Sequence, residues 1–375
     1  MKVRRMKVRY AALALLVGAC SSDTGPKPAP LAKIEHPQQV RELWSARAGD
    51  GDRFVFEPAF VDGAVYTAAR DGTVKKFEAG KGRTLWSMSA GVRLSGGVGA
   101  DDRLVVVANE DGEVIALDAE KGARRWTARV SSEVIAPPAI GAGLVLVRSI
   151  DNRVFAFGVE DGKRRWVYQR APSSLIIRAP AGITIDGETA FVGFAGGKLA
   201  ALALANGGVR WEATVALPKG GTELERVTDV VGDPAVQGRE VCAVTYQGRV
   251  GCYETANGRQ VWARDISSLT GVSLDARYAF VSDDRGAVQA FDRSNGRSVW
   301  KQDKLALRQL SAPLPVGELV AVGDFEGYIH LLARDTGAFV GRYATGGGPV
   351  RTAPRPIPGG LVVQTQGGAL HAIGL

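Results

Sequence analysis

The segment Asp111-Gly-Glu-Val-Ile-Ala-Leu-Asp-Ala-Glu-Lys-Gly-Ala-Arg-Arg-Trp126 is a unit that recurs along the chain. A turn dipeptide, Asp111-Gly112, precedes an alternating apolar segment, and a second turn containing Gly122 leads to Trp126. Tight turns on both sides of an alternating segment are typical of antiparallel strands. The unit therefore predicts successive strands of one β-sheet.

Tryptophan marks the period of the repeat. The seven tryptophans stand at positions 44, 86, 126, 166, 211, 262 and 300, separated by 42, 40, 40, 45, 51 and 38 residues. A glycine stands four residues before six of them: Gly82, Gly122, Gly162, Gly207, Gly258 and Gly296. The same frame after Gly337 places Gly341 at an eighth tryptophan position. We expect these large aromatic side chains to pack between neighbouring sheets rather than to stack on a ligand.

Each unit also has an apolar run before its first turn, and a short strand near a proline opens five of them: Pro58, Pro137, Pro180, Pro234 and Pro313. Four strands in about 40 residues is the blade period of a β-propeller. The sequence therefore predicts an all-β, eight-bladed β-propeller with four-stranded antiparallel blades over residues 38–375.

The two ends of this region are complementary. The last unit, residues 350–373, has three strands and lacks the fourth, whereas Val40-Arg-Glu-Leu-Trp44 is a fourth strand without a blade. We expect this N-terminal strand to complete the last blade and close the ring, because closure removes exposed sheet edges.

The first 37 residues predict export and anchoring. Five basic residues among positions 1–19 precede the apolar run Ala11–Val17, which is too short to span a bilayer and is typical of a signal peptide. Val17-Gly-Ala-Cys20 resembles the lipobox of bacterial lipoproteins. This resemblance implies cleavage before Cys20 and acylation of Cys20, and Ser21 after it favours the outer membrane. The alternative is an ordinary signal peptide with a chance cysteine. Residues 20–37 predict a flexible tether, because Ser21–Pro30 contains Pro26, Pro28 and Pro30.

Charge and cysteine content limit the function. The net charge of +8 falls to +3 without the five basic residues of the signal peptide, and no basic stripe follows. Nucleic-acid binding is therefore not expected. Cys242 and Cys252 flank the turn Gln247-Gly248 symmetrically. A hairpin there would place them opposite each other, which allows either a disulfide or two small buried strand residues.

Catalytic motifs are scarce. The three histidines, His36, His330 and His371, have no metal-ligand spacing, and no nucleophile-elbow motif is present. The segments Ala116–Trp126 and Ala290–Trp300 resemble the pyrroloquinoline-quinone propeller repeat, whose superfamily includes quinoprotein dehydrogenases. Many of those enzymes are longer and carry a vicinal cysteine pair, which this chain lacks. We expect neither an enzyme nor a cofactor.

Two connections between units are unusually long. Trp126 is separated from Pro137 by 11 residues, Trp166 from Pro180 by 14, and Trp211 from Pro234 by 23. In an up-and-down blade all such connections emerge on one face, so the two long ones are neighbours there. Long loops at such positions are more often functional than structural.

The lipobox, the tether and eight such blades together resemble the BamB family of propeller lipoproteins from the β-barrel assembly machinery. The likeness covers residues 20–375 and is most specific in Gly221–Val230 and Ser174–Arg178. It implies a scaffold that faces the periplasm and binds the periplasmic POTRA-type domains of the central barrel subunit, and that helps to fold unfolded outer-membrane protein clients. A propeller for another periplasmic ligand or a polysaccharide, and a small quinoprotein-like enzyme, are the alternatives.

The resemblance also implies partner-binding residues. In the first long loop they match Leu175, Ile177 and Arg178, and in the second Asp229 matches the first of two acids. Val231 stands where the second acid is expected, with Asp233 two residues further on. Two alternatives remain open: Leu175 and Ile177 could begin a buried inner strand, and Arg178 and Asp229 could pair with each other.

Overall fold

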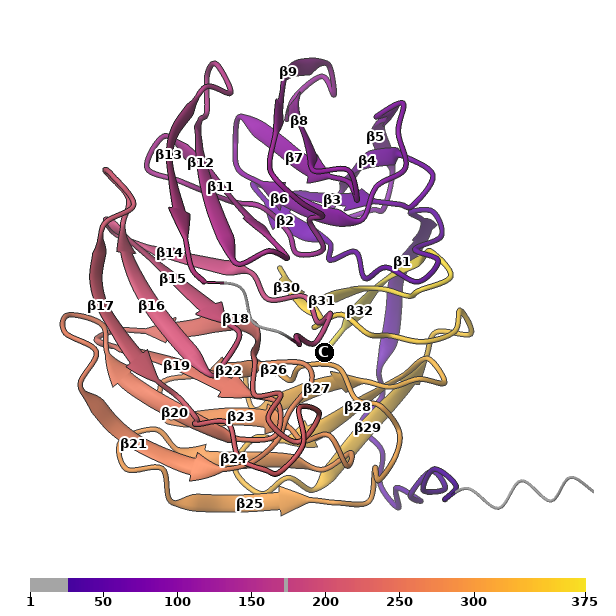
Figure 1. Cartoon of the computed structure of the whole chain (residues 1–375). Helices are drawn as coiled ribbons and strands as arrows, with labels where there is room; N and C mark the ends of the chain where they lie inside the picture. The colour runs from indigo at the N-terminus through magenta and orange to yellow at the C-terminus, as the bar shows by residue number, and fades with distance from the viewer. Residues whose placement is uncertain (1–25, 172–174) are drawn as a thin grey trace, which may run out of the picture.

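The computed structural model describes residues 26–171 and 175–375, so Cys20 and the signal peptide lie outside the described residues. The described part is built from 32 strands in eight four-stranded antiparallel sheets that follow one another round a ring (Figure 1). The prediction of an eight-bladed β-propeller is confirmed. The described residues contain no helix with the length and apolarity needed to cross a membrane.

Blades 1 to 4 follow the chain in order. Blade 1 contains β2 (Ala59–Val61), β3 (Ala64–Ala68), β4 (Thr73–Glu78) and β5 (Thr84–Ser89). Blade 2 contains β6 (Gly96–Ala100), β7 (Leu104–Ala108), β8 (Glu113–Asp118) and β9 (Arg124–Arg129). Blade 3 contains β10 (Ala139–Gly141), β11 (Leu144–Ser149), β12 (Arg153–Gly158) and β13 (Arg164–Gln169). Blade 4 contains β14 (Ile183–Asp186), β15 (Thr189–Phe194), β16 (Lys198–Ala203) and β17 (Val209–Thr214).

The second half continues the pattern. Blade 5 contains β18 (Val230–Gln237), β19 (Glu240–Thr245), β20 (Arg249–Glu254) and β21 (Gln260–Asp265). Blade 6 contains β22 (Val272–Leu274), β23 (Tyr278–Ser282), β24 (Val288–Asp292) and β25 (Ser298–Gln302). Blade 7 contains β26 (Leu314–Val316), β27 (Leu319–Gly323), β28 (Tyr328–Ala333) and β29 (Phe339–Ala344). Blade 8 contains β1 (Arg41–Arg47), β30 (Arg355–Ile357), β31 (Gly360–Gln364) and β32 (Ala369–Gly374).

Ring closure occurs where it was predicted. β1 lies beside β32 (Figure 1) and pairs with it antiparallel. In this register Trp44 lies opposite Ala372. Trp44 is buried, and its indole Nε1 donates to the carbonyl oxygen of Ala79 in blade 1 at 2.7 Å. The N-terminal strand therefore supplies both a missing sheet edge and a side chain that joins blade 8 to blade 1.

The repeat of glycine and tryptophan reflects packing between blades. In every blade except blade 7, a tryptophan lies on the repeat glycine of the next blade, as Trp126 lies on Gly162. A Cβ atom on Gly162 would stand 2.6 Å from the Trp126 ring, and its φ of +62° also favours glycine. The indole Nε1 of Trp126 donates to the carbonyl oxygen of Val159 at 2.7 Å. The core accordingly lies between blades, as the cluster of Leu104, Trp126 and Phe157 illustrates.

The structure explains why glycine, and not tryptophan, stands at position 341. The blade after it is blade 8, whose outer strand comes from the other end of the chain, so no turn glycine is present there to receive an indole. Segment 38–40 occupies this space instead: a Cβ atom on Gly341 would stand 3.1 Å from Val40 and 3.3 Å from the Gln38 carbonyl oxygen.

The described part of the predicted tether lies against blade 7. The Ala29 amide donates to the Ala306 carbonyl oxygen at 2.9 Å, and Arg308 Nη1 donates to the Ala29 carbonyl oxygen at 3.0 Å. Arg342 Nη2 donates to the Ala32 carbonyl oxygen at 3.0 Å. Two arginines of the propeller thus contact the main chain of the described part of this segment.

Cys242 and Cys252 face each other across β19 and β20 and form a disulfide. The sequence had left open a disulfide and two unbonded strand residues, and the structure contains the disulfide. It lies in the buried cluster between blades 5 and 6.

Candidate partner-binding surface

The connections from the last strand of one blade to the first strand of the next define what we call the loop face. They comprise residues 48–58, 90–95, 130–138, 170–182, 215–229, 266–271, 303–313 and 345–354. The longest two, 170–182 and 215–229, are consecutive, in agreement with the tryptophan-to-proline spacing. Exposed leucines occur in both: Leu175 in the first, and Leu217 and Leu224 in the second.

Arg178 is fixed by an acid that the sequence did not indicate. Its Nη1 and Nη2 donate to the two carboxylate oxygens of Glu133 at 2.6 and 2.7 Å. The Glu133 side chain is 9% exposed, whereas that of Arg178 is 52% exposed. Arg178 is thus oriented by a buried carboxylate and still presents about half of its side chain to solvent.

Asp229 is a buried residue that binds the main chain of connection 170–182. It is buried, and its Oδ2 accepts from the Ile177 amide at 2.7 Å while its Oδ1 accepts from the Gly196 amide at 3.2 Å. Burial raises the pKa of Asp229, although the two amides and the charge of Arg148 act in the opposite direction. Its carboxylate is therefore directed at main-chain donors inside the protein.

These contacts decide between the alternatives for the predicted residues. Arg178 and Asp229 do not pair with each other, because each has its own partner. Leu175 and Ile177 do not begin an inner strand, since β14 starts at Ile183. Leu175 is 42% exposed and Ile177 is half-buried. The four residues lie close together, with Leu175 and Arg178 at the surface and Asp229 beneath them.

Neither candidate for the second acid lies at the surface. Val231 is buried in the core between blades 5 and 6. Asp233 lies on the innermost strand β18, where its Oδ1 accepts from the Gly182 amide at 2.9 Å. Burial and the like charge of Glu57 raise the pKa of Asp233 to about 6, against the influence of Arg355.

These hydrogen bonds link three successive connections of the loop face. Glu133 of 130–138 binds Arg178 of 170–182. Asp229 of 215–229 binds Ile177 in that same middle connection. Sequence reasoning missed Glu133, which stands in a connection of ordinary length without a motif. It also missed Leu217 and Leu224, although apolar residues within a long polar loop were a usable signal.

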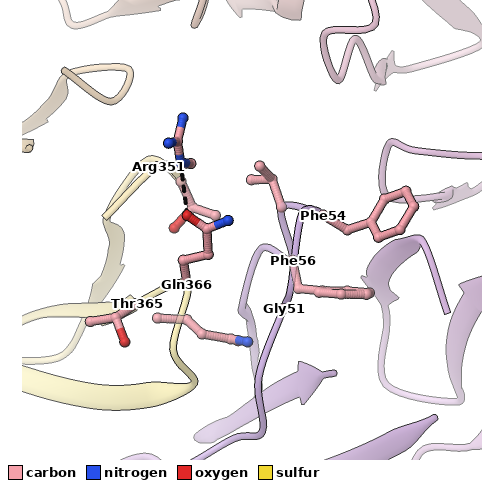
Figure 2. A pocket seen from close by; sticks show the side chains of 9 residues that line it. Gly51, Phe54, Phe56, Arg351, Thr365 and Gln366 are labelled. Carbon is pink, nitrogen blue, oxygen red and sulfur yellow. Dashed lines mark hydrogen bonds between the residues drawn. The ribbon is translucent and has the colours of Figure 1, made fainter. Parts of the chain in front are cut away.

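A hollow on the loop face lies where connection 48–58 meets blade 8. Phe54 and Phe56 form one wall, and on the opposite wall Arg351 Nε donates to Gln366 Oε1 at 2.9 Å (Figure 2). Its nine lining residues include no acid, histidine or cysteine. The side chains that most often act as general acids or bases are therefore absent from its lining.

Two of the three histidines, His330 and His371, make hydrogen-bond contacts within the propeller. His330 Nε2 lies 2.9 Å from Asp324 Oδ2, and Arg342 Nε donates to His330 Nδ1 at 3.2 Å. His371 Nδ1 lies 2.9 Å from Glu42 Oε2. In the described ranges no three residues among His, Cys, Asp and Glu are grouped so that they could hold a metal ion.

Comparison with known proteins agrees with this geometry. Residues 70–302 match the family model described as outer membrane protein assembly factor BamB. The chain belongs to the BamB family. It is 44% identical to BamB of Bordetella pertussis, over 93% of this chain and 91% of that protein, and 44% identical to BamB of Pseudomonas aeruginosa, over 96% of each.

Solved structures show the same relationship. The crystal structure of BamB from Moraxella catarrhalis superimposes with a TM-score of 0.82 at 27% identity, covering 90% of this chain and all of that one. A quinohemoprotein alcohol dehydrogenase from Comamonas testosteroni matches with a TM-score of 0.69 at 13% identity, over 89% of this chain and 76% of that one. The likeness of this BamB-family chain to that enzyme shows the shared propeller fold alone.

Proposed function

We propose that this chain is a non-catalytic assembly factor for outer-membrane proteins, anchored through an acylated Cys20 to the periplasmic face of the outer membrane. Its loop face binds the periplasmic domains of the central barrel subunit through Leu175, Ile177 and Arg178, with Asp229 holding their loop in place. Family membership supports the assembly role, and the lipobox resemblance supports the anchor.

The proposed binding site rests on one observation, which is that buried acids hold connection 170–182 in place. Leu175 is exposed and Arg178 is half exposed on the same loop. Asp229 binds the main chain of this loop at Ile177, and Glu133 binds the Arg178 guanidinium. Preorganised side chains lose little conformational entropy on binding, and arginine is enriched at the energetic centres of protein interfaces.

Pull-down from detergent-solubilised membranes tests this function. We expect the full chain to retain the barrel subunit, and Leu175→Asp to lose it because a charge replaces an apolar contact. Leu269→Asp is the matched control, since Leu269 is also an exposed leucine of the loop face, at 45% exposure, but lies on the shorter connection 266–271. Equal retention by both variants would contradict the proposed surface.

A further inference from the structure

Arg148 is an unusual residue at its place in the fold. It stands on β11 opposite Val154 of β12. In the other seven blades the same register position, opposite the first apolar residue of the third strand, carries a small or uncharged residue: Ala68, Ala108, Gly193, Val244, Ser282, Gly323 and Gln364. The propeller fold therefore does not require an arginine there.

The guanidinium of Arg148 is poorly paired for a charge inside a protein. Its Nη1 donates to the Ala181 carbonyl oxygen at 3.0 Å, while its buried Nε has no hydrogen-bond partner among the described residues. Burial lowers the pKa of Arg148 to about 10, which leaves it charged at neutral pH. The charge of Asp229 acts on Arg148 in the opposite direction and raises its pKa, but both oxygens of that carboxylate accept from main-chain amides. Charges in such surroundings cost free energy unless they are paired.

This guanidinium lines a pocket beneath connection 170–182. Isoleucines from three segments surround it: Ile135, Ile150, Ile176 and Ile177. Asp229 also lines the pocket, but both of its oxygens accept from main-chain amides. An apolar wall strengthens a charge-assisted hydrogen bond formed inside it. Arg148 lines this pocket, so an acceptor entering it would meet a charged donor beside apolar walls.

We propose that this pocket binds a carboxylate, supplied by an acidic side chain of the protein partner, with Arg148 as its donor. The planar guanidinium matches the geometry of a carboxylate, and the isoleucines fit the methylene groups of Asp or Glu. The inference rests on the proposed function, because the pocket lies directly under the loop that carries Leu175 and Arg178. It adds a specificity residue that lies deeper than the exposed contacts.

The first test requires no partner. In the full chain carrying Cys20→Ala, the side-chain Nε–H resonance of Arg148 can be assigned by its loss in Arg148→Lys. We expect sodium acetate to shift this resonance saturably at millimolar concentrations, and sodium chloride at equal ionic strength to leave it in place. The same response to both salts, or none, would overturn a carboxylate site.

The second test measures affinity and melting together. We expect Arg148→Met to weaken binding to the periplasmic domains of the barrel subunit on the order of tenfold or more, because it removes a hydrogen bond to a charged group. Its melting temperature should change little, because removal of a buried charge and loss of its attraction to Asp229 have opposite effects on stability. Gln364→Met, the matched change in blade 8, should leave binding unchanged.

The outcomes separate the two proposals. A lower melting temperature with full binding would show that Arg148 only braces the Ala181 carbonyl, and would overturn the pocket. If the unaltered chain does not bind the barrel domains, the proposed function fails, and the acetate titration alone decides whether the pocket takes a carboxylate.

Discussion

Arg178 and Glu133 form a two-pronged ion pair between consecutive connections of the loop face, at 2.6 and 2.7 Å. The acid is buried and the arginine is half exposed, so the pair fixes the direction of the guanidinium without covering it. This relationship makes Arg178 both a structural residue and a candidate contact, and the two roles predict different measurements.

Replacing Arg178 with alanine should weaken binding to the barrel subunit's periplasmic domains about thirtyfold, the effect of losing roughly 2 kcal/mol at an interface. The free energy of unfolding should also fall, because the buried Glu133 carboxylate loses both of its donors, although the exposure of the guanidinium to solvent limits this loss. Arg103→Ala is the control, since Arg103 pairs with Glu160 at 3.0 Å outside the loop face. Full binding by Arg178→Ala would remove it from the interface.

Asp229 should act through Ile177 and not by touching the partner. In Asp229→Ala the Ile177 amide loses its acceptor, so we expect its hydrogen exchange to accelerate and the affinity to fall with it. Asp229→Asn keeps an acceptor oxygen and should retain most of the protection. If affinity fell in both variants while exchange at Ile177 stayed slow, Asp229 would be a direct contact instead.

The repeat could be predicted because packing between blades is periodic in the sequence. Trp126 and Gly162 stand on neighbouring blades, and such a pair occurs in seven of the eight blade contacts, so the physical constraint is visible as spacing. Ring closure was predictable for a similar reason, since an unpaired last strand and a lone Trp44 strand have to meet.

The hydrogen bonds that hold the loop face together could not be predicted from residue spacing. Glu133 is 45 residues from Arg178, and nothing in its local sequence distinguishes it from other exposed-looking acids. The resemblance identified Asp229 but not the direction of its carboxylate, which depends on where the Ile177 amide lies in space. Arg148 became notable only when strand register showed what the other blades carry at its position.

Trp44 should contribute to stability as a core residue although it lies near the chain's N-terminal end. Trp44→Ala removes a buried ring that lies on Gly82 and its bond to Ala79, so we expect a loss of about 3–5 kcal/mol in the free energy of unfolding. Deletion of residues 38–46 should cost at least as much. Leu43→Ala, at an exposed neighbouring position, is the control for thermal melting. Equal melting of the deleted and complete chains would refute closure by this strand.

Cys20 should be the membrane anchor. We expect Cys20→Ala to release soluble protein into the periplasmic fraction, because a lipid-modified cysteine is the attachment that the lipobox resemblance implies. Ser21→Ala leaves the cysteine in place and should stay with the membrane. Continued pelleting of Cys20→Ala after a high-salt wash would show that something other than an acyl chain holds the protein there.

Asp233 should make stability depend on pH in the weakly acidic range. Burial and the nearby Glu57 raise its pKa in the folded chain to about 6, above the value of about 3.9 in an unfolded chain. The folded state therefore binds this proton more tightly, and the charged carboxylate destabilises the fold above pH 6. That cost is relieved as the pH falls from about 6 to about 4, so this residue's contribution to stability decreases as pH rises through that window.

The variant Asp233→Asn isolates this contribution, because asparagine keeps an acceptor for the Gly182 amide and carries no charge. At pH 7.5 we expect it to stabilise the chain by on the order of 1–3 kcal/mol, seen as a rise of several degrees in melting temperature. At pH 4.5, where Asp233 is itself largely protonated in the folded chain, the two proteins should melt together. An equal difference at both pH values would show that the Asp233 carboxyl does not titrate between them, and that Arg355 neutralises it throughout.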